Sequence, residues 1–188
     1  MTKRSAGEVQ IINAAKHLFL TKGYHRVSTT EIIKEAGVAK GTLYHHFPSK
    51  DHLAVAVIGE ILKDEIDAFL SIDFTREDSQ KRLTDFLFHL AKDARKREGS
   101  MMLLFQLTTA ITNEDASLEL ENVISEMFME TISFGEQLGI TDENLLNVFL
   151  ALIDGFVIHV WLRPKYYTDA KIMGFIKAAL SLLPKEVE

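Results

Sequence analysis

Apolar residues recur every three or four positions along most of this chain, which is the spacing of one face of an α-helix. The first pattern starts near Val9 and stops at Gly23, because glycine commonly follows the last turn of a helix. A second begins with a capping-box sequence at 28–31 and stops at Gly37, and a third spans 40–47, just before a proline. Two short helices joined by only a few residues, one of them glycine, predict a helix-turn-helix.

The rest of the chain repeats this helical spacing in longer segments. We expect a long helix from Ser49 that ends around 71–78. Further helices, separated by Gly99 and by polar segments, are expected at 76–97, 101–112, 118–138, 143–162 and 170–183. The sequence therefore predicts an all-α fold of about nine helices, in which a three-helix head precedes a larger helical body.

Composition narrows the class of protein. With 188 residues, 47% hydrophobic content and no cysteine, the chain has enough apolar material for a core and no thiol chemistry. It contains no run of about 18 uninterrupted apolar residues and no apolar segment near its start. We therefore expect a soluble, cytoplasmic protein that does not enter a membrane.

Charge is distributed unevenly along the chain. The net charge is −6, yet residues 1–52 hold eight basic and four acidic residues, a net +4, so the remainder carries −10. A basic segment on an acidic protein favours binding of that segment to a polyanion, with chance unevenness as the alternative.

The third predicted helix, at 40–47, separates apolar from polar residues. Leu43 and Phe47, four positions apart, share the face that packs inward. The opposite face, with Thr42 at its flank, presents Lys40, Gly41, Tyr44 and His45. These residue types suit contacts with bases and phosphates, and a helix of this size fits the major groove of DNA.

A metal site at the adjacent His45 and His46 is the alternative. Neighbouring side chains on a helix point about 100° apart, and no H-E-x-x-H motif or carboxylate at helical spacing accompanies them. We therefore expect no metal and no cofactor, and we expect His46 to be a packing residue on the inner flank of the helix, beside Leu43 and Phe47.

Residues 29–53, TTEIIKEAGVAKGTLYHHFPSKDHL, closely resemble the DNA-binding signature of TetR-family transcriptional regulators. The three-helix head of that family is similar to residues 8–53 as a whole, including a Gly-Tyr pair after the first helix. The resemblance implies a helix-turn-helix DNA-binding domain at 1–50 and a helical ligand-binding and dimerisation domain at 51–188.

The resemblance also implies roles in DNA binding for single positions. Those that meet bases or adjacent phosphates are Lys40, Gly41, Thr42 and Tyr44. Those that anchor the DNA backbone are Thr29, His45 and Lys50. One departure from the family pattern is Ala39, where many members have serine, so the recognition helix lacks a side-chain cap. We therefore expect residues 40–44 to be less ordered before DNA binds.

Small residues mark the last two expected helices. They are Ala151 and Gly155 in one helix, and Gly174 and Ala178 in the other. Such residues permit close approach of helices, either within one subunit or between two. In TetR-like proteins the final two helices usually pair with their copies, so the resemblance favours a homodimer interface at these positions. A homodimer would place two recognition helices in successive major grooves of a palindromic operator.

Large apolar residues in the body suit either a filled core or a pocket for a hydrophobic or aromatic ligand. Asp154 and His159 interrupt an apolar segment, so Asp154 requires a structural partner, a ligand or a dimer contact. The candidate ligand-binding residues are Met102, Phe105, Phe128, Asp154, His159 and Trp161.

Together these features predict a ligand-responsive repressor, and not an enzyme. It would bind a palindromic operator as a homodimer and be released by a small hydrophobic or aromatic effector. A transcriptional activator, or a DNA-binding regulator without a ligand, is the alternative. An all-helical enzyme or small-molecule carrier is more remote, because the sequence contains no evident catalytic constellation or phosphate-binding loop.

Overall fold

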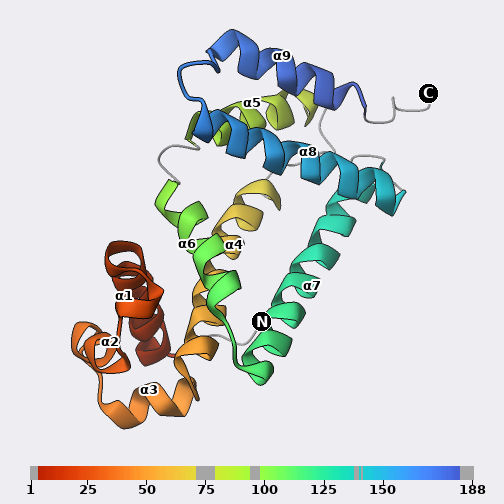
Figure 1. Ribbon diagram of the computed structural model, residues 1–188. Helices are drawn as coiled ribbons and strands as arrows, with labels where there is room; N and C mark the ends of the chain where they lie inside the picture. Colours follow the sequence, from red (N-terminus) through yellow and green to blue (C-terminus); the bar gives the residue numbers. More distant parts are fainter. Residues whose placement is uncertain (1–3, 71–78, 94–97, 138–139, 141, 183–188) are drawn as a thin grey trace. The chain divides into compact units, whose positions relative to one another are not determined.

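The computed structural model describes residues 4–70, 79–93, 98–137, 140 and 142–182. Within these residues the regular structure is helical and contains no strand (Figure 1). The helices are α1 Ala6–Lys22, η1 Tyr24–Arg26, α2 Thr29–Ala36, α3 Lys40–His46, α4 Lys50–Leu70, α5 Ser79–Asp93, α6 Glu98–Ala110, α7 Glu114–Gln137, α8 Glu143–Leu162 and α9 Asp169–Leu180. The predicted all-α class is confirmed.

Two predicted boundaries are wrong. Gly99 lies within α6 instead of before it, and a Cβ atom there would come 3.3 Å from Leu20 Cδ2 of α1, so glycine permits a close helix contact. α7 begins before its predicted start at 118, because the Asn113 side chain caps it by accepting the N–H of Ala116 at 3.0 Å.

The helices pack into two compact units, of which the first comprises residues 1–64 and 99–126. Its core contains buried side chains from the three head helices, from α4 and from α6, namely Ile11, Phe19, Ile32, Leu43, Leu53, Ile58, Leu103 and Leu107. The helix-turn-helix therefore shares one core with α6, which is distant in the sequence. The boundary between the compact units does not fall at residue 50, where the sequence places the end of the DNA-binding domain. The division into a DNA-binding domain at 1–50 and a ligand-binding domain at 51–188 stays a prediction about function.

The second unit comprises residues 65–98 and 127–188. Here α5, α8 and α9 enclose a separate apolar core, and Figure 1 shows α5 between the other two helices. Phe156 of α8 stacks on Phe175 of α9 with ring centroids 3.6 Å apart, and Lys92 of α5 pairs with Asp169 of α9 at 2.6 Å. These contacts fix the three helices against one another.

One described helix, α8, has the length and composition to cross a membrane, with a mean hydropathy of 2.0. Only 33% of its apolar stretch is buried in this chain. Part of an unusually apolar helix is therefore left uncovered.

Candidate nucleic-acid interface

Reciprocal hydrogen bonds hold the start of α2. Ser28 Oγ accepts the N–H of Glu31 at 3.2 Å, and the Glu31 carboxylate accepts the N–H of Ser28 at 2.9 Å. Lys22 Nζ donates to the same carboxylate at 2.9 Å, and this bond, with those from Ser28, lowers the pKa of Glu31 to about 2. The predicted capping box is confirmed, and it positions Thr29 in the first turn of α2.

A glycine in the left-handed region turns the chain between α2 and α3. Gly37 has a φ of 66°, which residues with side chains rarely adopt. Ala39 then begins α3 with an extended backbone, φ −73° and ψ 151°, and without a side-chain cap. The missing cap is confirmed, whereas weaker order at residues 40–44 stays a prediction.

The two faces of α3 differ as the sequence predicts. Leu43 and Phe47 are buried in the core of the first unit. The residues exposed on the other side are Lys40, Gly41, Tyr44 and His45. A Cβ atom at Gly41 would meet no heavy atom within 4 Å. This polar face is therefore open to a partner, while its inner side is held by packing.

Three of the predicted DNA contacts lie together on this surface. The hydroxyl of Tyr44 is 3.2 Å from Thr29 Oγ1, and Lys40 Nζ lies 5.9 Å from the centroid of the Tyr44 ring. Two hydroxyl groups near an ammonium group are suitable donors for phosphate oxygens. The contact also joins the start of α2 to the exposed face of α3.

Thr42 and His46 lie closer to the start of α1. The Thr42 methyl group is 3.4 Å from where a Cβ atom of Gly7 would be, and His46 Nε2 is 3.2 Å from Ser5 Oγ. Both side chains are half-buried. His46 is thus half-buried and contacts the start of α1, and only part of Thr42 is available to a partner.

Lys50 is not on the exposed face of α3. Its Nζ donates to the carbonyl oxygens of Tyr24 and Val27 at 3.0 and 3.1 Å, and it lies 4.1 Å from the centroid of the Tyr24 ring. Burial lowers the pKa of Lys50, an effect that the neighbouring Asp51 carboxylate opposes. In this conformation the ammonium group stabilises the turn that precedes α2, and its role as a phosphate anchor stays a prediction.

Sequence reasoning missed the residues that support this turn from the other side. Tyr24 OH donates to the Asp51 carboxylate, which also accepts the N–H groups of Thr112 and Asn113 at 3.0 and 2.9 Å. Burial opposes ionisation of Asp51, but these hydrogen bonds and Lys50 lower its pKa. Burial, followed by the bond to Asp51, raises the pKa of Tyr24. The Gly-Tyr pair is the one feature of the sequence that marks this turn, but it does not indicate that Asp51 and the amides of Thr112 and Asn113 support it.

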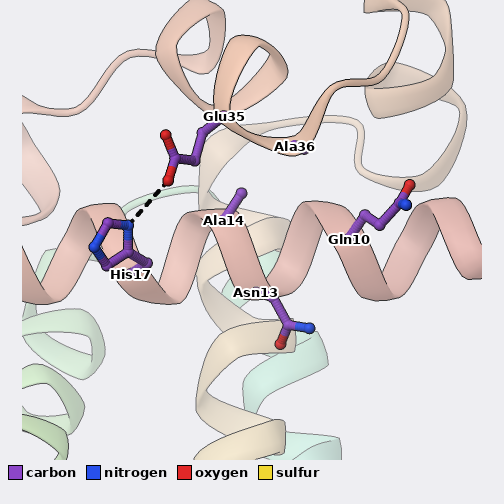
Figure 2. A pocket seen from close by; sticks show the side chains of 6 residues that line it. All are labelled: Gln10, Asn13, Ala14, His17, Glu35 and Ala36. Atoms are coloured by element: carbon purple, nitrogen blue, oxygen red, sulfur yellow. Dashed lines mark hydrogen bonds and ion pairs between the residues drawn. The ribbon is translucent and has the colours of Figure 1, made fainter.

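A polar depression of about 310 Å³ lies between α1 and α2. Figure 2 shows His17 and Glu35 directed toward each other across it, with His17 Nδ1 3.1 Å from Glu35 Oε1. Two such groups are fewer than a stable metal site needs, and the described residues contain no cluster of three or more potential ligands. We interpret the pair as a link between the two helices.

The six candidate ligand-binding residues are divided between the two compact units. Met102 and Phe105 lie in the first unit and are each 51% exposed on α6. In the second unit, Asp154 and His159 are exposed, Phe128 is half-buried, and Trp161 packs against the core formed by α5, α8 and α9. The core contact accounts for Trp161 without a ligand, and the binding role of all six stays a prediction.

The small residues predicted at a dimer interface lie largely on the surface. Ala151, Gly174 and Ala178 are exposed, and Gly155 is half-buried. A Cβ atom at either glycine would meet no heavy atom within 4 Å. Within the part of the chain that the structure describes, the two glycines therefore do not mediate a close helix contact, which removes one argument for the internal-packing alternative.

An exposed polar helix following a tight glycine turn, in a basic head joined to an all-helical body, defines a helix-turn-helix protein. The family model for bacterial regulatory proteins of the tetR family matches residues 11–57. The head of the chain, at these residues, therefore matches the tetR family.

Similar proteins share mainly this head. The HTH-type transcriptional regulator LmrA of Bacillus subtilis (strain 168) is 43% identical over 53 residues, 28% of either chain. The HTH-type transcriptional activator FasR of Mycolicibacterium smegmatis is 35% identical over 74 residues, 39% of this chain and 34% of that protein. The matched segments thus span about a third of the length of these curated relatives.

Likeness in fold extends over nearly the whole chain. The crystal structure of the multidrug binding protein EbrR complexed with imidazole aligns with a TM-score of 0.68 and 22% identity, covering 98% of each chain. The head and the helical body therefore share their fold with this protein of known structure.

Proposed function

We propose that this chain is a cytoplasmic repressor that binds a palindromic operator as a homodimer and leaves it when a small hydrophobic or aromatic effector binds the body. The observation that carries the proposal is the exposed face of α3, where Lys40, Tyr44 and Thr29 lie together in a basic head. Buried Leu43 and Phe47 anchor the inner side of α3, which leaves its polar face directed outward and able to enter a major groove.

A second copy of this chain is the partner that best suits α8 and α9. Val148, Ala151, Leu152 and Leu162 recur at helical spacing on α8 and are exposed, two of them more than half. Contiguous exposed apolar surfaces commonly mark an interface. Pairing with the same face of a second copy would cover them by two-fold symmetry, and two heads would then meet two half-sites.

Effector control is supported by α6. Its exposed Met102 and Phe105 offer apolar surface, while Leu103 and Leu107 on the other side belong to the core of the head. The multidrug binding protein EbrR has the same fold. An effector would release DNA by binding more tightly to a dimer conformation whose heads no longer fit successive grooves.

The alternative is transcriptional activation, because FasR is named as an activator. Deletion of the gene separates the two, since loss of a repressor raises transcription from the bound promoter and loss of an activator lowers it.

An electrophoretic mobility assay with DNA from upstream of the gene tests the binding itself. We expect salt-sensitive binding, and we expect Lys40→Ala to weaken it and to reduce the salt slope by about one. Lys81→Ala, which removes an exposed lysine of α5, is the matched control and should leave both unchanged. Absence of salt-sensitive binding by the unaltered protein, or equal effects of both substitutions, would overturn the proposal.

A further inference from the structure

One carboxylate connects two turns that are far apart in the sequence. One oxygen of Asp51, in the first turn of α4, accepts a hydrogen bond from the hydroxyl group of Tyr24, which lies in the turn between α1 and α2. Its other oxygen accepts the N–H groups of Thr112 and Asn113, in the turn between α6 and α7, at 3.0 and 2.9 Å. All of these residues lie within the first compact unit.

The turn at Tyr24 bears directly on the proposed DNA contacts. Lys50 holds the carbonyl groups of Tyr24 and Val27, and Val27 is followed by the capping box that begins α2. Thr29, which contacts Tyr44, is the first residue of that helix. A displacement of Tyr24 would therefore move one part of the exposed polar surface.

The turn at Thr112 and Asn113 joins two helices of the body, α6 and α7. Asn113 caps α7, and the preceding helix, α6, carries the exposed Met102 and Phe105. A second bond runs parallel to the first, because Gln106 of α6 accepts the N–H of Tyr24 at 3.4 Å. Any shift of α6 relative to α7 would change the geometry at Asp51.

We propose that Asp51 is a positioning residue that couples the α6–α7 turn to the turn preceding α2, so that a change in the body alters the DNA-binding surface. This inference rests on the proposed function and identifies a contact through which the body would act on the head. Aspartate suits this role, because it accepts bonds at both oxygens, whereas asparagine would present an N–H₂ group to at least one of the donors.

Coupling is reciprocal, so it can be tested with DNA and without the effector. If a change of conformation at the α6–α7 turn lowers the affinity of the head for DNA, then bound DNA must disfavour that change of conformation by the same free energy. We expect binding of the full-length protein to its upstream duplex to slow amide hydrogen exchange at residues 112–117 by about fivefold or more, the lower end of usual coupling factors.

Two variants test whether the effect passes through Asp51. Tyr24→Phe keeps the ring over Lys50 and the bonds from Thr112 and Asn113, and removes only the hydroxyl. We expect unchanged exchange at these two amides in the free protein, retained DNA binding, and loss of the slowing caused by DNA. Asp51→Asn should speed exchange at both amides in the free protein and also abolish the response to DNA.

The matched control is Asp64→Asn, which alters another carboxylate of α4, one that pairs with Lys16 of α1 at 3.6 Å. It should keep the full response to DNA. A protein that binds the duplex without any change at 112–117, or a Tyr24→Phe variant with a full response, would overturn the inference while leaving the proposed function intact. A protein that binds no duplex would overturn the proposed function, and the coupling inference with it.

Discussion

At the scale of single residues, the start of α3 lacks a side-chain cap at the edge of the proposed DNA-binding surface. Ser5 and Thr168 begin α1 and α9 with φ −70° and ψ near 160°, and each accepts a backbone N–H group through its hydroxyl. Ala39 has almost the same backbone angles, φ −73° and ψ 151°, but no oxygen to offer. The backbone is therefore ready for a cap that the residue does not supply.

Replacement of Ala39 by serine should raise the free energy of unfolding by about 1 kcal/mol, the usual contribution of a helix cap. It should also slow amide exchange at residues 40–44, which in the unaltered free protein should exchange faster than α1. Chemical denaturation and hydrogen exchange measure the two effects. Ala39→Val, which adds atoms without an acceptor, should produce neither, and equal protection of residues 40–44 and α1 before substitution would contradict the prediction.

At the scale of helices, α6 serves the head as well as the body. Leu103 and Leu107 are buried with side chains of α1 and α4, whereas Met102 and Phe105 are exposed. Gly99 allows the same helix to approach Leu20 of α1 closely. The head therefore depends for its core on a helix that the sequence places in the body.

Truncation of Leu107 to alanine should lower the free energy of unfolding by about 2–5 kcal/mol, because it leaves a cavity in the core of the head. Phe105→Ala on the same helix should change it by less than about 0.5 kcal/mol, because half of that side chain is already in water. Urea denaturation of both variants gives the comparison. Similar losses for the two would show that α6 does not contribute to the head core through its buried face.

At the scale of the whole molecule, α8 exposes an apolar strip to solvent, and we propose that a second copy of the chain covers it. The strip includes Val148 and Leu152 and lies beside exposed small residues. Because each half of a palindromic operator would be read by one head, dimerisation would set the operator affinity as well as the stability of the body.

Leu152→Glu should convert the dimer to a monomer, since two copies would bring like charges into an apolar interface. Operator affinity should then fall by about a hundredfold, the lower end of the gain from two linked contacts. Light scattering and the mobility assay measure these effects. Leu118→Glu, at an exposed leucine of α7, is the control and should remain dimeric. A dimeric Leu152→Glu variant would place the interface elsewhere.

Local features of this protein follow from its sequence alone. The capping box at Ser28 and Glu31, the glycine turn at Gly37 and the uncapped Ala39 each depend on residues at most a few positions apart. The division of α3 into a buried and an exposed face follows from its helical repeat. Fold class and the polar face of the head could therefore be predicted.

Only the tertiary structure decided where long side chains and distant segments meet. Lys50 is directed to the carbonyl groups of Tyr24 and Val27, Asp51 binds amides some 60 residues away, and α6 enters the core of the head. The periodicity of a helix states which face is apolar, but many arrangements of helices can bury that face. Which helix covers which, and which polar groups are then brought within hydrogen-bonding distance, is determined by packing of the complete chain.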